Sequence, residues 1–248
     1  MRDMGIARHL ELEGAYNVRD LGGYGTVDGG HTRWRMFLRA DSLHRLSPTS
    51  QAKLVDYGVR TVVDLRRTVE TLAEPDVFAD SPDVEYHWHN MTGDSFSDPY
   101  GDRDPPARFE QYTNILDQRI GQIGETLAVM AVPDGAPALF HCGAGQDRTG
   151  MIAALLLGLA GVPPQTIAED YTLTAQHFVE RYLGKDAPPG VDPAEYEVEA
   201  YRRRQCPPEA MLKTVEYLAD RYGGVQGYVR AAGLSDLEIG RLRSALLE

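Results

Sequence analysis

The stretch of sequence that decides the fold is residues 137–150, PALFHCGAGQDRTG, which run directly into MIAALLL at 151–157. Residues 137–141 have the apolar character of a buried strand, and residues 151–157 begin an apolar segment typical of a helix. A short loop with glycines separates the two, so the sequence predicts a strand, a tight loop and a helix. The N-terminus of a helix presents unpaired backbone N–H groups and the positive end of its dipole. We therefore expect the loop to bind an anion, and phosphate is the usual one.

Two side chains of this loop predict covalent chemistry on phosphorus. Cys142 is the candidate nucleophile, because a helix N-terminus stabilises the thiolate form of a cysteine. Attack by that thiolate would give a phosphocysteine intermediate and split one difficult displacement into two easier ones. Arg148 is the second candidate catalytic residue, since a planar guanidinium can hold two phosphoryl oxygens at once. The candidate phosphate-binding residues follow the cysteine: Gly143, Ala144, Gly145, Gln146, Asp147, Arg148 and Thr149.

The alternative interpretation is a structural cysteine, since an isolated cysteine often behaves as a small buried hydrophobe. The whole string, with His141 before the cysteine and Arg-Thr-Gly after it, favours the phosphate site. A metal site is not expected, because His141 and Cys142 are adjacent and the one other cysteine, Cys206, forms no Cys-x-x-Cys pair. We therefore expect no metal and no other cofactor. Thr149 could donate its hydroxyl to the sulfur, and His141 is expected to orient the loop.

The reaction also needs a carboxyl group that gives a proton to the leaving oxygen and later takes one from water. Asp147 is the first choice, because it lies in the loop beside Arg148. Asp64 is the second, because it lies at the carboxyl end of an expected strand, where α/β sheets gather their ligand sites; its structural alternative is a pair with Arg66. The third option is a group of loop aspartates: Asp94, Asp98 and Asp102.

Several segments resemble one known family. Residues 141–150 resemble the signature of protein tyrosine phosphatases, in the version of an atypical bacterial branch that includes a secreted mycobacterial phosphatase. Other segments that resemble this branch are NVRDLGGY at 17–24, RADSL at 39–43, VVDLR at 62–66, and YGG with YVR within 222–230. The resemblance implies a tyrosine-phosphatase fold and a cysteine-dependent phosphatase (a phosphoric monoester hydrolase) that needs no metal.

The resemblance also points to one difference within the loop. The family usually has a lysine where this chain has Gln146, and that lysine is associated with activity on phosphoinositides as well as on phosphopeptides. A glutamine keeps hydrogen bonding and lacks the charge. Phosphotyrosine is therefore the first expected substrate and phosphoserine or phosphothreonine the next. A phosphoinositide or inositol-phosphate phosphatase is the alternative, and the rivals outside this class are a phosphate-binding module without turnover and a rhodanese-type sulfurtransferase.

Composition sets the wider limits. The chain has 248 residues, of which 42% are hydrophobic, and we expect a single phosphatase domain over residues 1–248. Its net charge of -12 argues against nucleic acid as a partner. Two cysteines, one expected to be reactive, fit a reducing cytoplasm, with export without a recognisable signal as the alternative. No apolar run is long enough for a membrane span. The expected partner is a phosphorylated protein or small phosphomonoester, and the sequence gives no oligomeric state.

The order of expected elements predicts an α/β fold with a parallel-rich central sheet flanked by helices on both faces and a helical C-terminal part. Residues 22–39 are expected to form a hairpin with its turn at 28–30. Residues 180–206, interrupted by glycine and proline at 184–193, are expected to be helical and to form a lid over the site, with an exposed helix pair of no catalytic role as the alternative. Strands are expected at 60–65, 84–89 and 137–141, and helices at 48–58, 67–73, 105–132 and from 149 onward.

Two arginines near the N-terminus have two interpretations. Arg19 and Arg39 could lie near the phosphate, or they could pair with aspartates such as Asp20 and Asp41 to fix loops. The second arrangement is the commoner one in proteins. The sequence alone leaves the choice open.

Overall fold

The computed structural model describes residues 7–94, 105–183 and 197–248. Its centre is a five-stranded sheet in the order β1-β2-β5-β3-β4, in which β2, β5, β3 and β4 run parallel and β1 pairs antiparallel with β2. The predicted parallel-rich sheet is therefore confirmed. The strands are β1 (Arg19–Asp20), β2 (Phe37–Ala40), β3 (Thr61–Asp64), β4 (Glu85–Trp88) and β5 (Ala138–His141).

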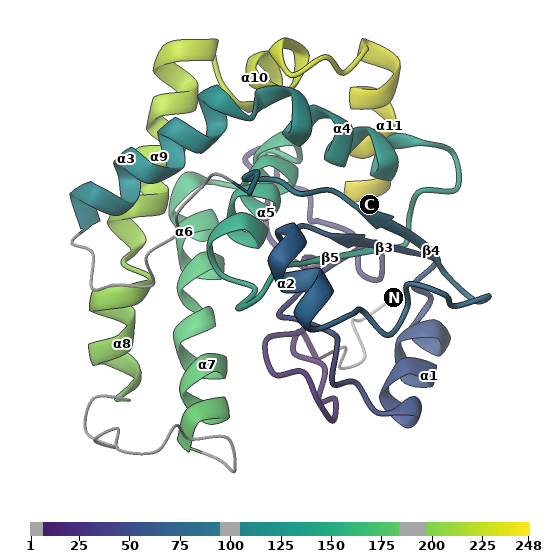
Figure 1. Ribbon diagram of the computed structural model, residues 1–248. Helices are drawn as coiled ribbons and strands as arrows, with labels where there is room; N and C mark the ends of the chain where they lie inside the picture. The colour runs from purple at the N-terminus through teal and green to yellow at the C-terminus, as the bar shows by residue number, and fades with distance from the viewer. Residues whose placement is uncertain (1–6, 95–104, 184–196) are drawn as a thin grey trace.

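Each face of the sheet is covered by helices. Successive side chains of a strand point to opposite faces, so neighbouring residues belong to different buried clusters. Val63 and Phe140 belong to the larger buried cluster, which holds α5, α9 and α11, whereas Val62 and Leu139 belong to a second cluster with α1. Figure 1 shows α4 and α11 above the sheet and α1 below it. The helices are α1 (Pro48–Tyr57), α2 (Thr68–Ala73), α3 (Pro105–Gln118), α4 (Ile120–Ala131), α5 (Asp147–Leu159), α6 (Pro164–Thr172), α7 (Thr174–Leu183), α8 (Val198–Gln205), α9 (Pro208–Tyr222), α10 (Val225–Ala231) and α11 (Asp236–Leu246).

The helix α5 sits at the centre of the molecule. Residues 148–157 and Leu159 are all buried, because α5 is packed by α6, α10 and α11 as well as by the sheet. A helix that is apolar all round has to be buried in this way. The loop that precedes α5 is thus held between β5, at the middle of the sheet, and the most enclosed helix of the fold.

The expected hairpin at 22–39 is wrong. The turn at residues 26–30 forms, with the N–H of Thr26 bonded to the carbonyl of Gly30, but its flanks form no strand: they are joined by an isolated bridge between Gly25 and His31 and by backbone hydrogen bonds of Thr32 with Gly23 and Tyr24. The strand begins at Phe37, and all four of its residues are buried. Residues 33–39 alternate between arginine and apolar side chains with the period of a strand, but most of this stretch precedes β2. The arginine that lies in β2, Arg39, is buried in an ion pair.

Other expected elements are confirmed, including the helix that ends at Gly58 and the helical stretch 105–132 in two pieces. In the region 180–206, α7 and α8 lie side by side, as Figure 1 shows, while the predicted break at 184–193 lies outside the described residues. Within the described parts of the chain, no helix is long and apolar enough to cross a membrane.

Candidate active site

The loop between β5 and α5 lies at the carboxyl edge of the parallel strands. The neighbouring strands anchor its start: the N–H of Leu65, after β3, bonds to the carbonyl of His141, and the N–H of Ser42, after β2, bonds to that of Gly143. Ligands of open α/β sheets gather at this edge. The site is therefore built by loops that follow three adjacent strands.

The carbonyl groups of this loop are all turned toward one side. Besides the Ser42 contact, Asn17 Nδ2 donates to Ala144 at 3.0 Å, Arg39 donates to Gly145 at 2.7 Å, and the N–H of Gly150 donates to Gln146. In a trans peptide the N–H of the next residue points opposite to the carbonyl. The N–H groups of residues 144–147 accordingly point away from these donors and have no acceptor among the described residues, which is the arrangement of an anion cradle at a helix N-terminus.

Cys142 and Arg148 stand at the two ends of this cradle. Cys142 is buried, with 2% of its surface exposed, and it is not in a disulfide. Both terminal nitrogens of Arg148 contact the carboxylate of Glu70 in α2, at 2.7 and 2.9 Å. Burial alone would raise the pKa of Glu70, but its hydrogen bonds and charge interaction with Arg148 lower it to about 2. Glu70 is thus ionised at neutral pH, and it fixes the plane of the arginine fork.

Asp147 is anchored through one of its two oxygens. Its Oδ1 accepts from Arg108 at 2.8 Å and from the hydroxyl of Tyr112, both in α3. Among the described residues no donor reaches its Oδ2, and a quarter of the side chain is exposed.

Asp64 is in a different position. Both of its oxygens are occupied, by Arg66 at 2.7 to 3.0 Å and by the hydroxyl of Tyr86 at 2.9 Å, and the side chain is fully buried. The pKa of Asp64 lies below its ordinary value, because the charge of His141 and the bonds from Arg66 outweigh the effect of burial. The geometry matches the structural alternative, a carboxylate paired with Arg66.

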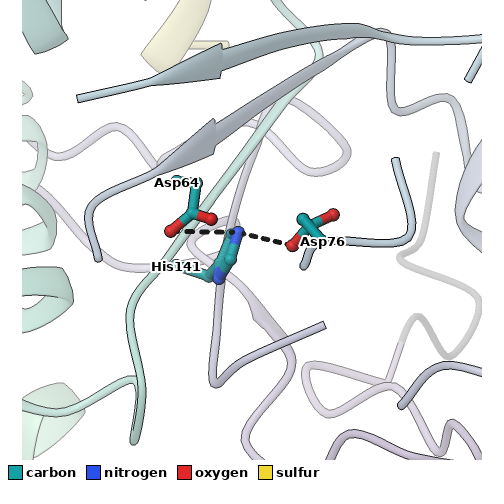
Figure 2. Close-up of side chains that lie close together, drawn as sticks. All are labelled: Asp64, Asp76 and His141. Carbon is teal, nitrogen blue, oxygen red and sulfur yellow. Dashed lines mark ion pairs between the residues drawn. The ribbon is translucent and has the colours of Figure 1, made fainter. Parts of the chain in front are cut away.

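Figure 2 shows a buried cluster beneath the start of the loop, in which the imidazole of His141 lies between Asp64 and Asp76. Its Nε2 is 3.1 Å from Asp76 and 3.8 Å from Asp64. Arg66 is the second cation of the cluster. Burial alone would lower the pKa of His141, but the two carboxylates raise it above its ordinary value. A protonated His141 gives two positive and two negative charges, so the cluster is balanced.

The same cluster holds the one group of potential metal ligands found among the described residues, with ligand atoms within 4.8 Å of one another. The guanidinium of Arg66 already takes both oxygens of Asp64, and it lies 3.7 Å from Asp76. A divalent ion added there would meet that positive charge at close range. The donor set fits an ion-pair cluster and does not fit a metal site.

Gln146 is turned away from the cradle toward α8. Its amide donates to the backbone carbonyl of Gln205 and accepts from the hydroxyl of Tyr201 at 3.2 Å. Gln205 in turn accepts from Arg108, so α8 contacts both the loop and the anchor of Asp147. The end of α8 is thus hydrogen-bonded directly to residues of the expected active site.

The remaining predicted residues are less central. Asp94 is fully exposed and caps α2 by accepting from Thr68, whereas Asp98 and Asp102 lie outside the described residues. Thr149 is buried, and its hydroxyl has no partner among the described residues. Four residues of the site were not predicted from the sequence: Glu70, Asp76, Arg108 and Tyr112. A signal existed for two of them, because Arg108 and Tyr112 are four positions apart, on one face of a helix.

The buried cluster generates a prediction for stability. Asp76→Asn should lower the free energy of unfolding by roughly 3 kcal/mol at about pH 6, because it leaves a buried cation with one carboxylate fewer. The raised pKa of His141 stabilises the folded state fully below the ordinary histidine pKa, and that contribution is lost as pH rises through the raised value. The deficit of the variant should therefore shrink toward alkaline pH. Urea denaturation across this pH range measures it.

The matched control is Asp83→Asn, which makes the same change at an exposed loop position. It should alter stability by less than about 0.5 kcal/mol at every pH. A deficit for Asp76→Asn that stays constant with pH would contradict the protonated state of His141.

Known proteins are similar to this chain over most of its length. The model of the tyrosine phosphatase family matches residues 10–248. The chain is 31% identical to a tyrosine-protein phosphatase of Nostoc commune, over 85% of this chain and 74% of that protein. It is 25% identical to the triple specificity protein phosphatase PtpB of Mycobacterium tuberculosis, over 96% of this chain and 98% of that protein. The match spans nearly the whole sequence, and the chain is therefore a phosphatase that belongs to the tyrosine phosphatase family.

Proposed function

We propose that this phosphatase hydrolyses phosphotyrosine in proteins through a phosphocysteine formed on Cys142. The observation that carries the proposal is the orientation of the loop: its carbonyl groups are held on one side, and the N–H groups of residues 144–147, on the other, have no acceptor in the part of the chain that the structure describes. Preorganised donors of this kind stabilise charge that develops in a transition state. A buried cysteine begins the loop, and an arginine with a fixed guanidinium plane ends it.

The proposed reaction has two steps. The thiolate of Cys142 attacks phosphorus, the bond from phosphorus to the leaving oxygen breaks, and that oxygen takes a proton from Asp147. Water then attacks the phosphocysteine, Asp147 takes a proton from the water, and the sulfur–phosphorus bond breaks. The loop N–H groups and Arg148 hold the phosphoryl oxygens in both steps. The unpartnered hydroxyl of Thr149 is available to stabilise the departing thiolate.

We assign the proton transfer to Asp147 rather than Asp64 on the difference in their contacts. Asp147 keeps one oxygen open at a partly exposed position, whereas Asp64 has both oxygens bound inside the protein. A group that moves protons to a substrate has to reach it within hydrogen-bond distance. Asp64 instead supports the loop through Arg66 and His141.

The neutral side chain of Gln146 and its contacts favour a phosphotyrosine substrate over a phosphoinositide. A side chain that is neutral and bonded to α8 adds no cation for a second phosphate group. The names of the relatives fit a protein substrate, since one is a tyrosine-protein phosphatase and the other a triple specificity protein phosphatase. We also propose that α8 is the lid of the site, because Tyr201 and Gln205 contact the loop directly.

The direct test is hydrolysis of p-nitrophenyl phosphate in the presence of a metal chelator. Wild-type protein should turn over, and Cys142→Ser should lower turnover by at least about a thousandfold, because the hydroxyl is a far weaker nucleophile. Chelator-sensitive turnover would contradict the mechanism. A folded protein that binds phosphate and hydrolyses nothing would favour the phosphate-binding module instead.

Asp147→Asn should lower kcat/KM, which reports the first step, by about a hundredfold on phenyl phosphate, whose leaving group needs a proton. The loss of kcat/KM on p-nitrophenyl phosphate should be much smaller, since nitrophenolate leaves without one, although the slower second step lowers kcat on both substrates. The matched control is Asp64→Asn, which makes the same change at a buried carboxylate and should affect both substrates equally. A leaving-group dependence that appears for Asp64→Asn and not for Asp147→Asn would exchange the two roles.

Gln146→Lys should raise activity on a soluble phosphoinositide by about fivefold relative to a phosphotyrosine peptide, the effect of one added, partly screened charge. Gln122→Lys, at an exposed position of α4, adds the same charge away from the loop and should leave the ratio unchanged. Steady-state rates on the two substrates measure the ratio. A wild-type enzyme that already prefers the phosphoinositide would contradict the assignment of Gln146.

A further inference from the structure

A second buried charge cluster lies behind the loop, on the side to which its carbonyl groups point. Arg19 of β1, Arg39 of β2 and Asp170 of α6 are at most 1% exposed. Asp170 accepts from Arg19 at 3.1 Å, from Arg39 at 2.5 Å and from the hydroxyl of Tyr24 at 2.8 Å. Three elements far apart in the sequence are therefore joined at one carboxylate.

Arg39 connects this cluster to the loop. One terminal nitrogen binds Asp170, and the other donates to the carbonyl of Gly145 at 2.7 Å. Arg39 thus spans the distance between a fixed anion and one peptide of the cradle. A guanidinium can make two such bonds in a fixed plane, whereas an ammonium acts as a single point of charge.

The peptide that Arg39 holds is also the most constrained one of the loop. Gly145 has a φ of 67°, and a Cβ built on it would lie 2.6 Å from the carbonyl oxygen of Ala40. Its backbone is therefore pressed against the end of β2, one residue beyond Arg39. Because the carbonyl of Gly145 points toward Arg39, the N–H of Gln146 points the opposite way, toward the cradle.

Asp170 remains charged at any working pH. Burial alone would raise its pKa, but the charges of Arg19 and Arg39 lower it far below its ordinary value. Burial and the charge of Arg39 lower the pKa of Arg19 to about 10. The two arginines thus repel each other and depend on the carboxylate between them, so the position of each guanidinium is set by Asp170.

We propose that Arg39 and Asp170 are positioning residues of the phosphate loop: Asp170 orients the guanidinium of Arg39, which holds the Gly145 carbonyl inward and so directs the loop N–H groups at the substrate oxyanion. The inference rests on the proposed function, since it names what prepares that site. It also resolves the two interpretations of Arg39, which fixes the loop through an aspartate distant in the sequence.

The test compares Arg39→Lys with wild type by the binding of tungstate, a tetrahedral oxyanion, measured by titration calorimetry. Lysine keeps the charge and loses the fork, so it cannot hold both Asp170 and Gly145. We expect tungstate affinity to fall by about tenfold or more and KM for p-nitrophenyl phosphate to rise with it. The control is Tyr228→Phe, which removes a buried hydrogen bond to Leu116 in α3 and should reduce thermal stability without changing tungstate affinity.

Two results would overturn the inference: a folded Arg39→Lys that binds tungstate within twofold of wild type, or an equal loss of affinity in Tyr228→Phe. If Arg39→Lys does not fold, a crystal structure of wild-type protein with tungstate decides. The Gly145 carbonyl should then stay bonded to Arg39, and a carbonyl turned toward the anion would contradict the proposal. Wild-type protein that binds tungstate but hydrolyses nothing would reject the proposed function and leave this inference standing.

Discussion

The carbonyl groups of residues 143–146 are held on one side of a short loop, and the rest of the site depends on that constraint. A peptide whose carbonyl is fixed has its following N–H fixed in the opposite direction. Here the fixing donors come from Asn17, Arg39 and Ser42, and the helix α5 supplies the last one. The loop therefore needs no rearrangement to present a row of donors to an oxyanion.

Different elements around the loop hold its backbone and its side chains. Donors next to β1 and in or after β2 bind the backbone of the loop. The helices α2 and α3 bind its functional side chains, through Glu70 for Arg148 and Arg108 for Asp147. Several of the charges that hold the loop are buried. Their desolvation is unfavourable unless opposite charges pair with them at short range. Both the His141 cluster and the Asp170 cluster contain such ion pairs.

The sequence predicted those parts of the structure that depend on residues close together in the chain. A strand, a glycine loop and a buried helix follow one another within residues 137–159, so their order and type could be read from periodicity. The partners Glu70, Asp76 and Asp170 could not be found in this way, because each lies far along the chain and meets the loop only through the tertiary fold. The hairpin at 22–39 was wrong for a related reason: the alternation at 33–39 lies mostly before β2, and the arginine that lies in β2 is held by a tertiary ion pair that the sequence pattern does not show.

The central claim is that the phosphoryl group is transferred to the sulfur of Cys142. The most direct measurement is mass spectrometry of the phosphorylated peptide from enzyme quenched with acid during turnover. Asp147→Asn enzyme with p-nitrophenyl phosphate is the best sample, because the first step needs no acid there and the second lacks its base. The account predicts a phosphoryl adduct on the peptide that contains Cys142. Turnover by wild-type enzyme with no adduct on that peptide, or with the adduct on another residue, would contradict it.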